Sequence, residues 1–138
     1  MDDMSFPPII LSLLSGLFGS IITAACQVYF ANRKEQRRKR AACLILQKEI
    51  ISHKYYLLDY LDNPASLQYF KTYSTQHIEQ LKLELVNLEP YHLKIILEHI
   101  SAIENLHAVL QITNKPTGDW KQLIDKASKA IDCLNHYI

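Results

Sequence analysis

Five of the eight tyrosines of the chain crowd into one short stretch, where their rings could stack on a flat ligand. They are Tyr55, Tyr56, Tyr60, Tyr69 and Tyr73. Aromatic rings stack on nucleobases, because every base has a π face. Lysines could then neutralise the phosphates of such a ligand as point charges; the candidates are Lys54, Lys71, Lys82 and Lys94. Packing of these rings between two helices is the alternative interpretation.

Three histidines form a second group of candidate ligand-binding side chains. His92, His99 and His107 project from one side of a predicted helix over 90–112, into the same apolar stripe as Ile96 and Ile103. Histidines on an inward face are usually hydrogen-bonded core residues. They could also line a polar cavity or make an interface respond to pH. Spacing of seven and eight residues separates the rings by about 10 Å or more along one helix, so we expect no metal site.

No motif of an enzyme accompanies these residues. The sequence has no glycine-rich phosphate loop, HExxH, GxSxG or paired catalytic carboxylates. Its three cysteines, Cys26, Cys43 and Cys133, are too widely spaced for a metal site and odd in number. We therefore expect free thiols in a reducing compartment, no cofactor and no enzymatic activity.

The candidate ligand-binding residues follow a segment with the properties of a membrane anchor. Residues 4–32 carry no charge, and Ile9–Phe30 supplies 22 mostly apolar residues. At about 1.5 Å of rise per residue, a helix of this length crosses the hydrocarbon core of a bilayer. The sequence predicts a single-pass membrane protein with the lipid bilayer as its first partner.

Basic residues follow this segment directly and predict its orientation. They are Arg33, Lys34, Arg37, Arg38, Lys39 and Arg40, whereas the acidic Asp2 and Asp3 precede the segment. Lysine and arginine near a span collect on the cytoplasmic side and attract anionic headgroups. The start of the chain lacks the positive charge of a cleaved signal peptide. We expect a retained anchor, with the N-terminus outside and the C-terminal part in the cytoplasm.

Small residues recur four apart along the predicted span in two neighbouring series. One series is Ser12, Gly16, Ser20 and Ala24, and the other is Ser15, Gly19 and Thr23, which Gln27 continues. Small faces let membrane helices approach closely, so the pattern predicts self-association of the spans into a homo-oligomer. Small residues are also common in membrane helices in general. A third interpretation gives an oligomeric pore a polar lining, although the span has no charged residue. The lining residues would be Ser12, Ser15, Ser20, Thr23 and Gln27.

Residues 41–138 are long enough for one small domain. They hold nine lysines, eleven acidic residues and no arginine. A domain of this charge is a poor partner for duplex nucleic acid, whose binding depends on neutralising phosphates. The sequence thus divides into the N-terminus and span (1–32), a basic juxtamembrane segment (33–40) and a cytoplasmic domain (41–138).

The periodicity of this domain is helical, and we expect an all-α fold. No proline or glycine lies between Ser20 and Asp62, so the span helix should continue from about Pro8 to Leu61. Its apolar stripe is Leu46, Ile50, Leu57 and Leu61, widened by Ile45, Ile51, Tyr55 and Leu58.

Further helices are expected over 65–73, over about 76–88 after a cap at Ser74 or Thr75, from Pro90 to about Ile112, and from Asp119 to the end. A loop over 113–118 separates the last two. The connections are short, which favours an up-and-down bundle of about four helices.

In its order of anchor, basic run and helical domain, the chain resembles the small membrane-anchored helical effectors of prokaryotic antiviral defence. These include effectors of type III CRISPR systems gated by cyclic oligoadenylates. The resemblance implies a domain that senses a small anionic, nucleotide-like signal and oligomerised spans that perturb the membrane. The alternative is a membrane-tethered adaptor that binds no ligand and positions a cytoplasmic protein.

Overall fold

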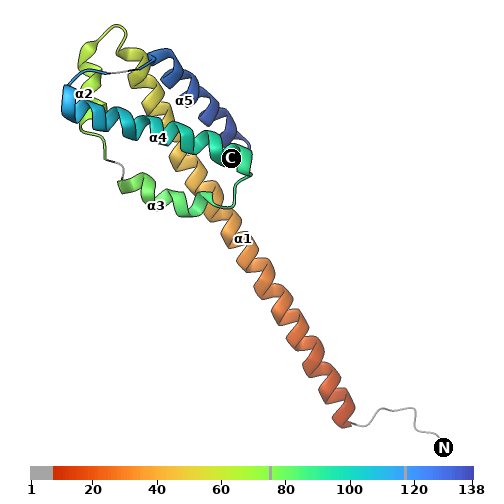
Figure 1. The fold of residues 1–138 in the computed structure, drawn as a ribbon. Helices are drawn as coiled ribbons and strands as arrows, with labels where there is room; N and C mark the ends of the chain where they lie inside the picture. The colour runs from red at the N-terminus through yellow and green to blue at the C-terminus, as the bar shows by residue number, and fades with distance from the viewer. Residues whose placement is uncertain (1–7, 75, 117) are drawn as a thin grey trace, which may run out of the picture. The chain divides into compact units, whose positions relative to one another are not determined.

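The computed structural model describes residues 8–74, 76–116 and 118–138, and every regular element in them is a helix. The elements are α1 (Pro8–Asp59), the 3-10 helix η1 (Pro64–Ser66), α2 (Leu67–Lys71), α3 (Gln76–Leu85), α4 (Pro90–Thr113) and α5 (Trp120–Asn135) (Figure 1). The expected all-α class is confirmed. The predicted roles of Asp2, Asp3 and Thr75, and the Thr117 part of the predicted loop, lie outside the described residues.

The chain divides into two units between Arg37 and Arg38, and α1 contributes residues to both. In the first unit, α1 is long and apolar enough to cross a membrane, and no residue of its most apolar window is buried. Leu13 is 68% exposed and Phe18 is 62% exposed. Large apolar side chains are exposed all round this segment, as in a helix whose surroundings are apolar. The helix is thus a candidate membrane span by its length and composition.

The hydroxyl groups of this segment bond to their own helix. Ser20 Oγ donates to the carbonyl oxygen of Gly16 at 2.9 Å, and Thr23 Oγ1 donates to that of Gly19 at 2.8 Å. Such bonds supply the hydroxyl protons with acceptors where water is absent. Nothing lies within 4 Å of a Cβ atom added at either glycine. The small-residue side of the helix is therefore open in the single chain.

Local capping explains where the helices of the second unit begin and end. The Asn63 side chain accepts a hydrogen bond from the Ala65 N–H at 3.2 Å, directly before η1. Asn114 ends α4 in the left-handed conformation, with φ 55°. Asp119 begins α5 by accepting a hydrogen bond from the Lys121 N–H at 3.0 Å. The start of the last helix at Asp119 is thus one that the sequence predicted.

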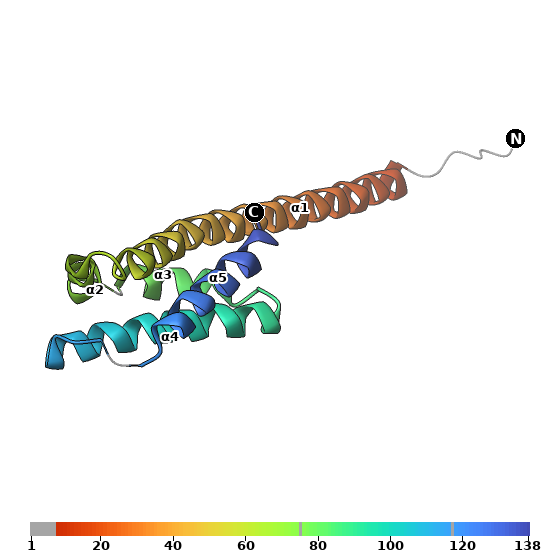
Figure 2. The same cartoon turned by 90° about the horizontal axis from the view of Figure 1, so that it is seen from above.

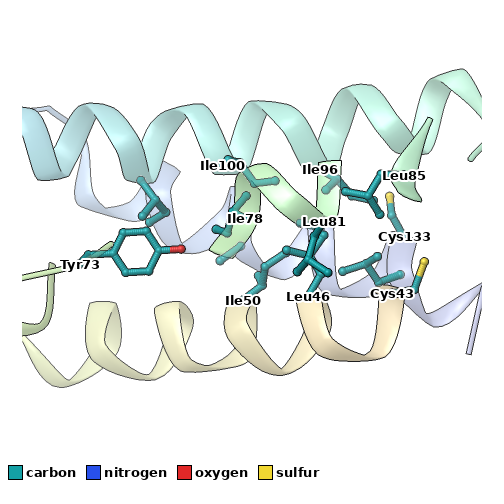
Figure 3. Packing of buried hydrophobic residues seen from close by; sticks show 14 of the residues in the cluster. Cys43, Leu46, Ile50, Tyr73, Ile78, Leu81, Leu85, Ile96, Ile100 and Cys133 are labelled. Atoms are coloured by element: carbon teal, nitrogen blue, oxygen red, sulfur yellow. The ribbon is translucent and has the colours of Figure 1, made fainter. Parts of the chain in front are cut away.

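The core of the second unit combines residues from α1, α2, α3, α4 and α5. The α1 side chains in it recur at intervals of three and four residues: Cys43, Leu46, Ile50, His53 and Leu57. Figure 3 shows Leu46 and Ile50 directed toward α3 and α4, where they meet Ile78, Leu81, Ile96 and Ile100. Burial of each such side chain stabilises the fold by about 1.5–3 kcal/mol.

Helices α4 and α5 lie side by side and run in opposite directions (Figures 1 and 2). The α5 residues Ala127 and Ala130 are fully buried, and their small side chains allow the two helices to approach closely. Polar contacts connect α5 to α1 as well. Gln47 Nε2 donates to Asn135 Oδ1 at 2.5 Å, and Trp120 Nε1 donates to the Leu57 carbonyl oxygen at 2.6 Å.

The wide apolar stripe predicted on α1 differs from the observed one. Leu46, Ile50 and Leu57 are buried, but the other members of the stripe are 44–65% exposed: Ile45, Ile51, Tyr55, Leu58 and Leu61. Residues 44, 51 and 58 lie about 100° around the helix from the buried set, since each residue turns an α-helix by about that angle. The covering helices reach only one side of α1.

Candidate functional site

Two tyrosines of the cluster predicted from the sequence, Tyr69 and Tyr73, pack around a histidine that was not singled out. His53 of α1 lies within 5.0 Å of Tyr73, 6.2 Å of Tyr69 and 6.3 Å of Phe70, measured between ring centroids. Tyr56 stacks on Tyr69 at 4.0 Å with an interplanar angle of 13°. The segment after α1 thus closes over the end of that helix with its aromatic side chains. The rings contact one another, as the packing interpretation requires.

A buried pair of histidines lies at the centre of this cluster. His53 Nδ1 is 3.0 Å from His99 Nε2, and both side chains are 0% exposed. The other two ring nitrogens, His53 Nε2 and His99 Nδ1, have no hydrogen-bond partner among the described residues. One ring must donate and the other accept, so at least one histidine is neutral.

Burial determines the protonation of this pair. Burial, with a smaller contribution from the charge that His99 can carry, lowers the pKa of His53 to about 3. Burial also lowers the pKa of His99 to about 4, with a smaller contribution from Lys126. A charged imidazole loses its hydration here, and no carboxylate is among the causes of either shift. Both histidines are therefore neutral near pH 7.

The other two predicted histidines also make hydrogen bonds within the fold. His107 Nδ1 lies 2.8 Å from the Phe70 carbonyl oxygen. At the opposite end of α4, His92 Nδ1 lies 2.7 Å from the Tyr137 hydroxyl and 3.3 Å from a Glu89 carboxylate oxygen. The three histidines therefore belong to three different contacts, and each one connects α4 to another part of the chain.

The tyrosines of the cluster differ in environment. The Tyr73 hydroxyl donates to Glu49 Oε1 at 3.1 Å. Burial, then the Glu49 charge, raises the pKa of Tyr73, and the same causes raise the pKa of Tyr69 to about 12. Tyr60 packs on Trp120 at 4.6 Å, and Tyr55 is 61% exposed. All of these hydroxyls except that of Tyr55 belong to side chains at least partly buried against other helices.

The four candidate lysines do not converge on the cluster. Lys82 pairs with Glu79 at 2.7 Å and with Glu104 at 3.5 Å. Lys71 is partly buried and its carbonyl oxygen accepts from Gln111 Nε2 at 2.5 Å. Lys54 is on α1, whereas Lys94 lines a groove on α4.

That groove, between α4 and α5, has a volume of about 790 Å³. Leu93, Leu97, Leu106, Val109 and Leu123 are its large apolar lining residues. Lys94 and Lys126 are among its polar lining residues, with Glu98 and Asp119. A smaller hollow beside it adds Tyr91 and Lys129. Pockets of this size and mixed lining are typical of small-molecule sites.

The described residues contain no group of three or more His, Cys, Asp or Glu that could hold a metal ion. Cys43 and Cys133 are buried, and burial raises the pKa of both thiols. A thiol whose pKa is raised is a weak nucleophile at neutral pH.

Most bases of the juxtamembrane run are exposed, as a membrane-surface role requires: Arg33, Lys34, Arg37, Arg38 and Arg40. Lys39 differs from them. Its Nζ donates to the Asn87 carbonyl oxygen at 3.3 Å and lies 4.9 Å above the centre of the Tyr137 ring. This base serves the packing of the second unit.

Sequence reasoning missed His53 and Lys126. A signal for His53 exists, because it lies three residues after Ile50 and four before Leu57, on the inward stripe of α1. Lys126 has no such signal. Its place beside Lys94 depends on how α5 packs against α4.

Comparison of the whole chain with protein families, characterised proteins and solved structures found no match.

Proposed function

We propose that this chain is a single-pass membrane effector that responds to a small anionic, nucleotide-like signal. The observation that carries the proposal is a contrast in burial along one chain. Residues 9–30 expose apolar side chains throughout, while residues 38–138 bury most of theirs wholly or partly in and against a core. A long exposed apolar helix is costly in water and stable in a bilayer. This contrast supports a membrane segment joined to a folded domain, and the proposal gives that domain the sensing role.

In this proposal the N-terminus is outside and the second unit forms a cytoplasmic up-and-down helical bundle. The basic run supports the orientation, because five of its six bases are exposed and available to anionic headgroups. The open glycine positions support association of the spans into a homo-oligomer. Rearrangement of associated spans would perturb the membrane, as the resemblance to antiviral effectors implies. The domain carries out no enzymatic reaction.

The groove between α4 and α5 is the best-supported place for the signal. Its apolar lining suits a flat base, and Lys94 and Lys126 suit phosphate oxygens as point charges. The tyrosine and histidine cluster has less room, because its rings stack on one another and its histidine pair is fully buried. Two lysines bind phosphate weakly in one subunit, but an oligomer repeats the site around its axis.

Calorimetry with cyclic di- to hexanucleotides, together with dye release from proteoliposomes, tests the proposal. We expect one nucleotide to bind and to release dye. The double variant Lys94→Gln/Lys126→Gln should lose tenfold or more in affinity. The double variant Lys115→Gln/Lys121→Gln removes the same charge from exposed positions outside the groove and should bind normally. Absence of binding and of dye release with every nucleotide would contradict the proposal.

The groove also favours a second function, the membrane-tethered adaptor. The groove is open at the surface, and its lining residues on α4 extend from Leu93 to Val109. An amphipathic helix of a partner protein could place its apolar face there. Stoichiometric recovery of one protein with the full chain from membranes, lost on Leu97→Glu and without any nucleotide response, would support the adaptor.

A further inference from the structure

The side of α1 that faces away from the core carries apolar residues at regular intervals in the second unit. Leu44, Ile51 and Leu58 recur every seven residues and are 40%, 48% and 45% exposed. Tyr55 lies four residues after Ile51 and three before Leu58, and it is 61% exposed. Alternating intervals of four and three place these side chains in one seam, which is the pattern of a helix that pairs in a coiled coil.

We propose that this seam, formed by Leu44, Lys48, Ile51, Tyr55 and Leu58, is a contact with the same seam of a second copy of the chain. The orientation of the chain in the membrane indicates that the partner at this seam is a second copy. The inference rests on the proposed function in one respect, namely that α1 is anchored in the membrane. Two copies inserted in the same direction present their α1 helices in parallel, so identical residues meet across a two-fold axis.

Charges beside the seam fit this parallel arrangement. Core positions of a coiled coil are called a and d, and here Tyr55 is at a and Leu58 is at d. In a parallel pair, the residue directly before position a in one helix lies beside the residue five positions later in the other helix. Lys54 precedes Tyr55 and Asp59 follows Leu58, so each Lys54 lies beside the partner's Asp59. Two-fold symmetry forms this ion pair twice. Asp59 also accepts a hydrogen bond from the Ser66 hydroxyl, which holds its carboxylate near the end of α1.

Lys48 occupies a core position of the seam and is exposed in the single chain. One polar residue at such a position weakens a coiled coil and restricts its register. The seam is also short, spanning about two heptads. Anchoring in a bilayer raises the effective concentration of the partner helix, which allows a weak contact to form there. The contact is therefore one made by membrane-bound copies.

Cysteine cross-linking of the full chain in vesicles tests the contact. In a Cys26→Ser background, the remaining native thiols, Cys43 and Cys133, are buried. Mild oxidation of the Ile51→Cys variant should convert most of the protein to a species of twice 16.0 kDa. The matched control is Leu83→Cys on α3, where the native side chain is 78% exposed, and it should cross-link at least fivefold less.

A charge variant tests the predicted register. Lys54→Glu places two acids together in each pair and should reduce cross-linking at position 51 several-fold, whereas Lys54→Arg should preserve it. Equal cross-linking at positions 51 and 83, no product at 51, or a product of another mass would overturn the inference. Dye release from the same vesicles, measured with the cyclic di- to hexanucleotides, separates the inference from the proposed function. Nucleotide-triggered release without a product at 51 contradicts the contact alone. A product at 51 without release by any nucleotide supports the contact and contradicts the sensing role.

Discussion

The histidine pair couples α1 to α4 through two groups that must stay uncharged. His53 and His99 are fully buried, and no carboxylate is among the causes of their pKa shifts. The carboxylate of Glu49 accepts a hydrogen bond from Tyr73, and Lys126 opposes protonation of His99. The pair therefore stabilises the fold only while both rings are neutral. Its stability contribution must depend on pH.

We predict that the second unit loses stability as the pH falls from about 7 to 5. The unfolded histidines titrate near 6.5 and the folded ones at about 3 and 4, so the unfolded state binds more protons throughout this window. The stabilisation is complete above pH 6.5 and is lost progressively below it. Two groups at 1.36 kcal/mol per pH unit each give a loss of about 4 kcal/mol by pH 5.

Denaturant titration of the full chain in detergent measures this loss, with Trp120 as the only tryptophan probe. The variant His53→Leu/His99→Leu should flatten the pH dependence. His136→Gln alters an exposed histidine and should keep it. A wild-type stability that is the same at pH 7 and pH 5 would show that the pair titrates normally.

Trp120 completes the C-terminal end of α1. The carbonyl oxygens of Tyr56, Leu58 and Asp59 accept hydrogen bonds from backbone N–H groups, whereas that of Leu57 accepts from the Trp120 indole at 2.6 Å. We predict that Trp120→Phe costs about 1–2 kcal/mol, because the carbonyl loses its donor. Trp120→Ala should cost about 3 kcal/mol, since the half-buried ring is lost as well.

Denaturation followed by far-ultraviolet circular dichroism measures both effects. Tyr91→Ala is the control, because Tyr91 is 71% exposed and its loss should change stability by less than about 0.5 kcal/mol. If Trp120→Phe is as stable as the wild type, the indole hydrogen bond contributes nothing.

At the scale of elements, the helices could be predicted more fully than the surfaces they bury. Neighbouring residues determine the helix starts at Pro90 and after Asp119 and the break at Pro64. The buried half of α1 is not, because Leu46 and Ile51 have similar hydrophobicity and only the covering helices distinguish them. The histidine pair likewise depends on the register between α1 and α4. Local residues therefore predict where a helix ends, whereas tertiary contacts determine which side of it is buried.

For the span, we predict that Gly16→Leu/Gly19→Leu reduces association of the chain in mild detergent. Both glycines have open space around an added Cβ atom, so the leucines should leave the helix itself intact and obstruct only a neighbouring helix. Light scattering should report a smaller particle for the variant. Leu13→Ala/Leu17→Ala is the control, because it changes exposed residues of the same segment without adding bulk. An unchanged particle size for the glycine variant would contradict packing through the small residues.

At the scale of the whole molecule, the two units have opposite solvent requirements. The first exposes apolar residues, and the second buries them beneath a surface of lysines and acids. The division between the units falls inside the basic run, at Arg37 and Arg38. The candidate groove could not be predicted, since its lining comes from two helices whose contact no local pattern specifies. The candidate membrane helix could be predicted, because its length and lack of charge are read directly from the sequence.

The orientation of the molecule should depend on the exposed bases and not on Lys39. Replacing Arg33, Lys34, Arg37, Arg38 and Arg40 with Gln, together with Asp2→Lys and Asp3→Lys, reverses the charge bias across the span. We expect a large fraction of this variant to insert with its C-terminus outside, because lysine and arginine close to a span determine its topology. Lys39 stays unchanged, since it bonds to Asn87 and its loss would disturb the second unit directly. Protease protection of a C-terminal epitope in sealed vesicles measures the orientation. The control variant Lys115→Gln/Lys121→Gln removes bases far from the span in sequence and should insert as the wild type does. If the variant with the reversed charge bias keeps the wild-type orientation, the bases beside the span do not determine the topology.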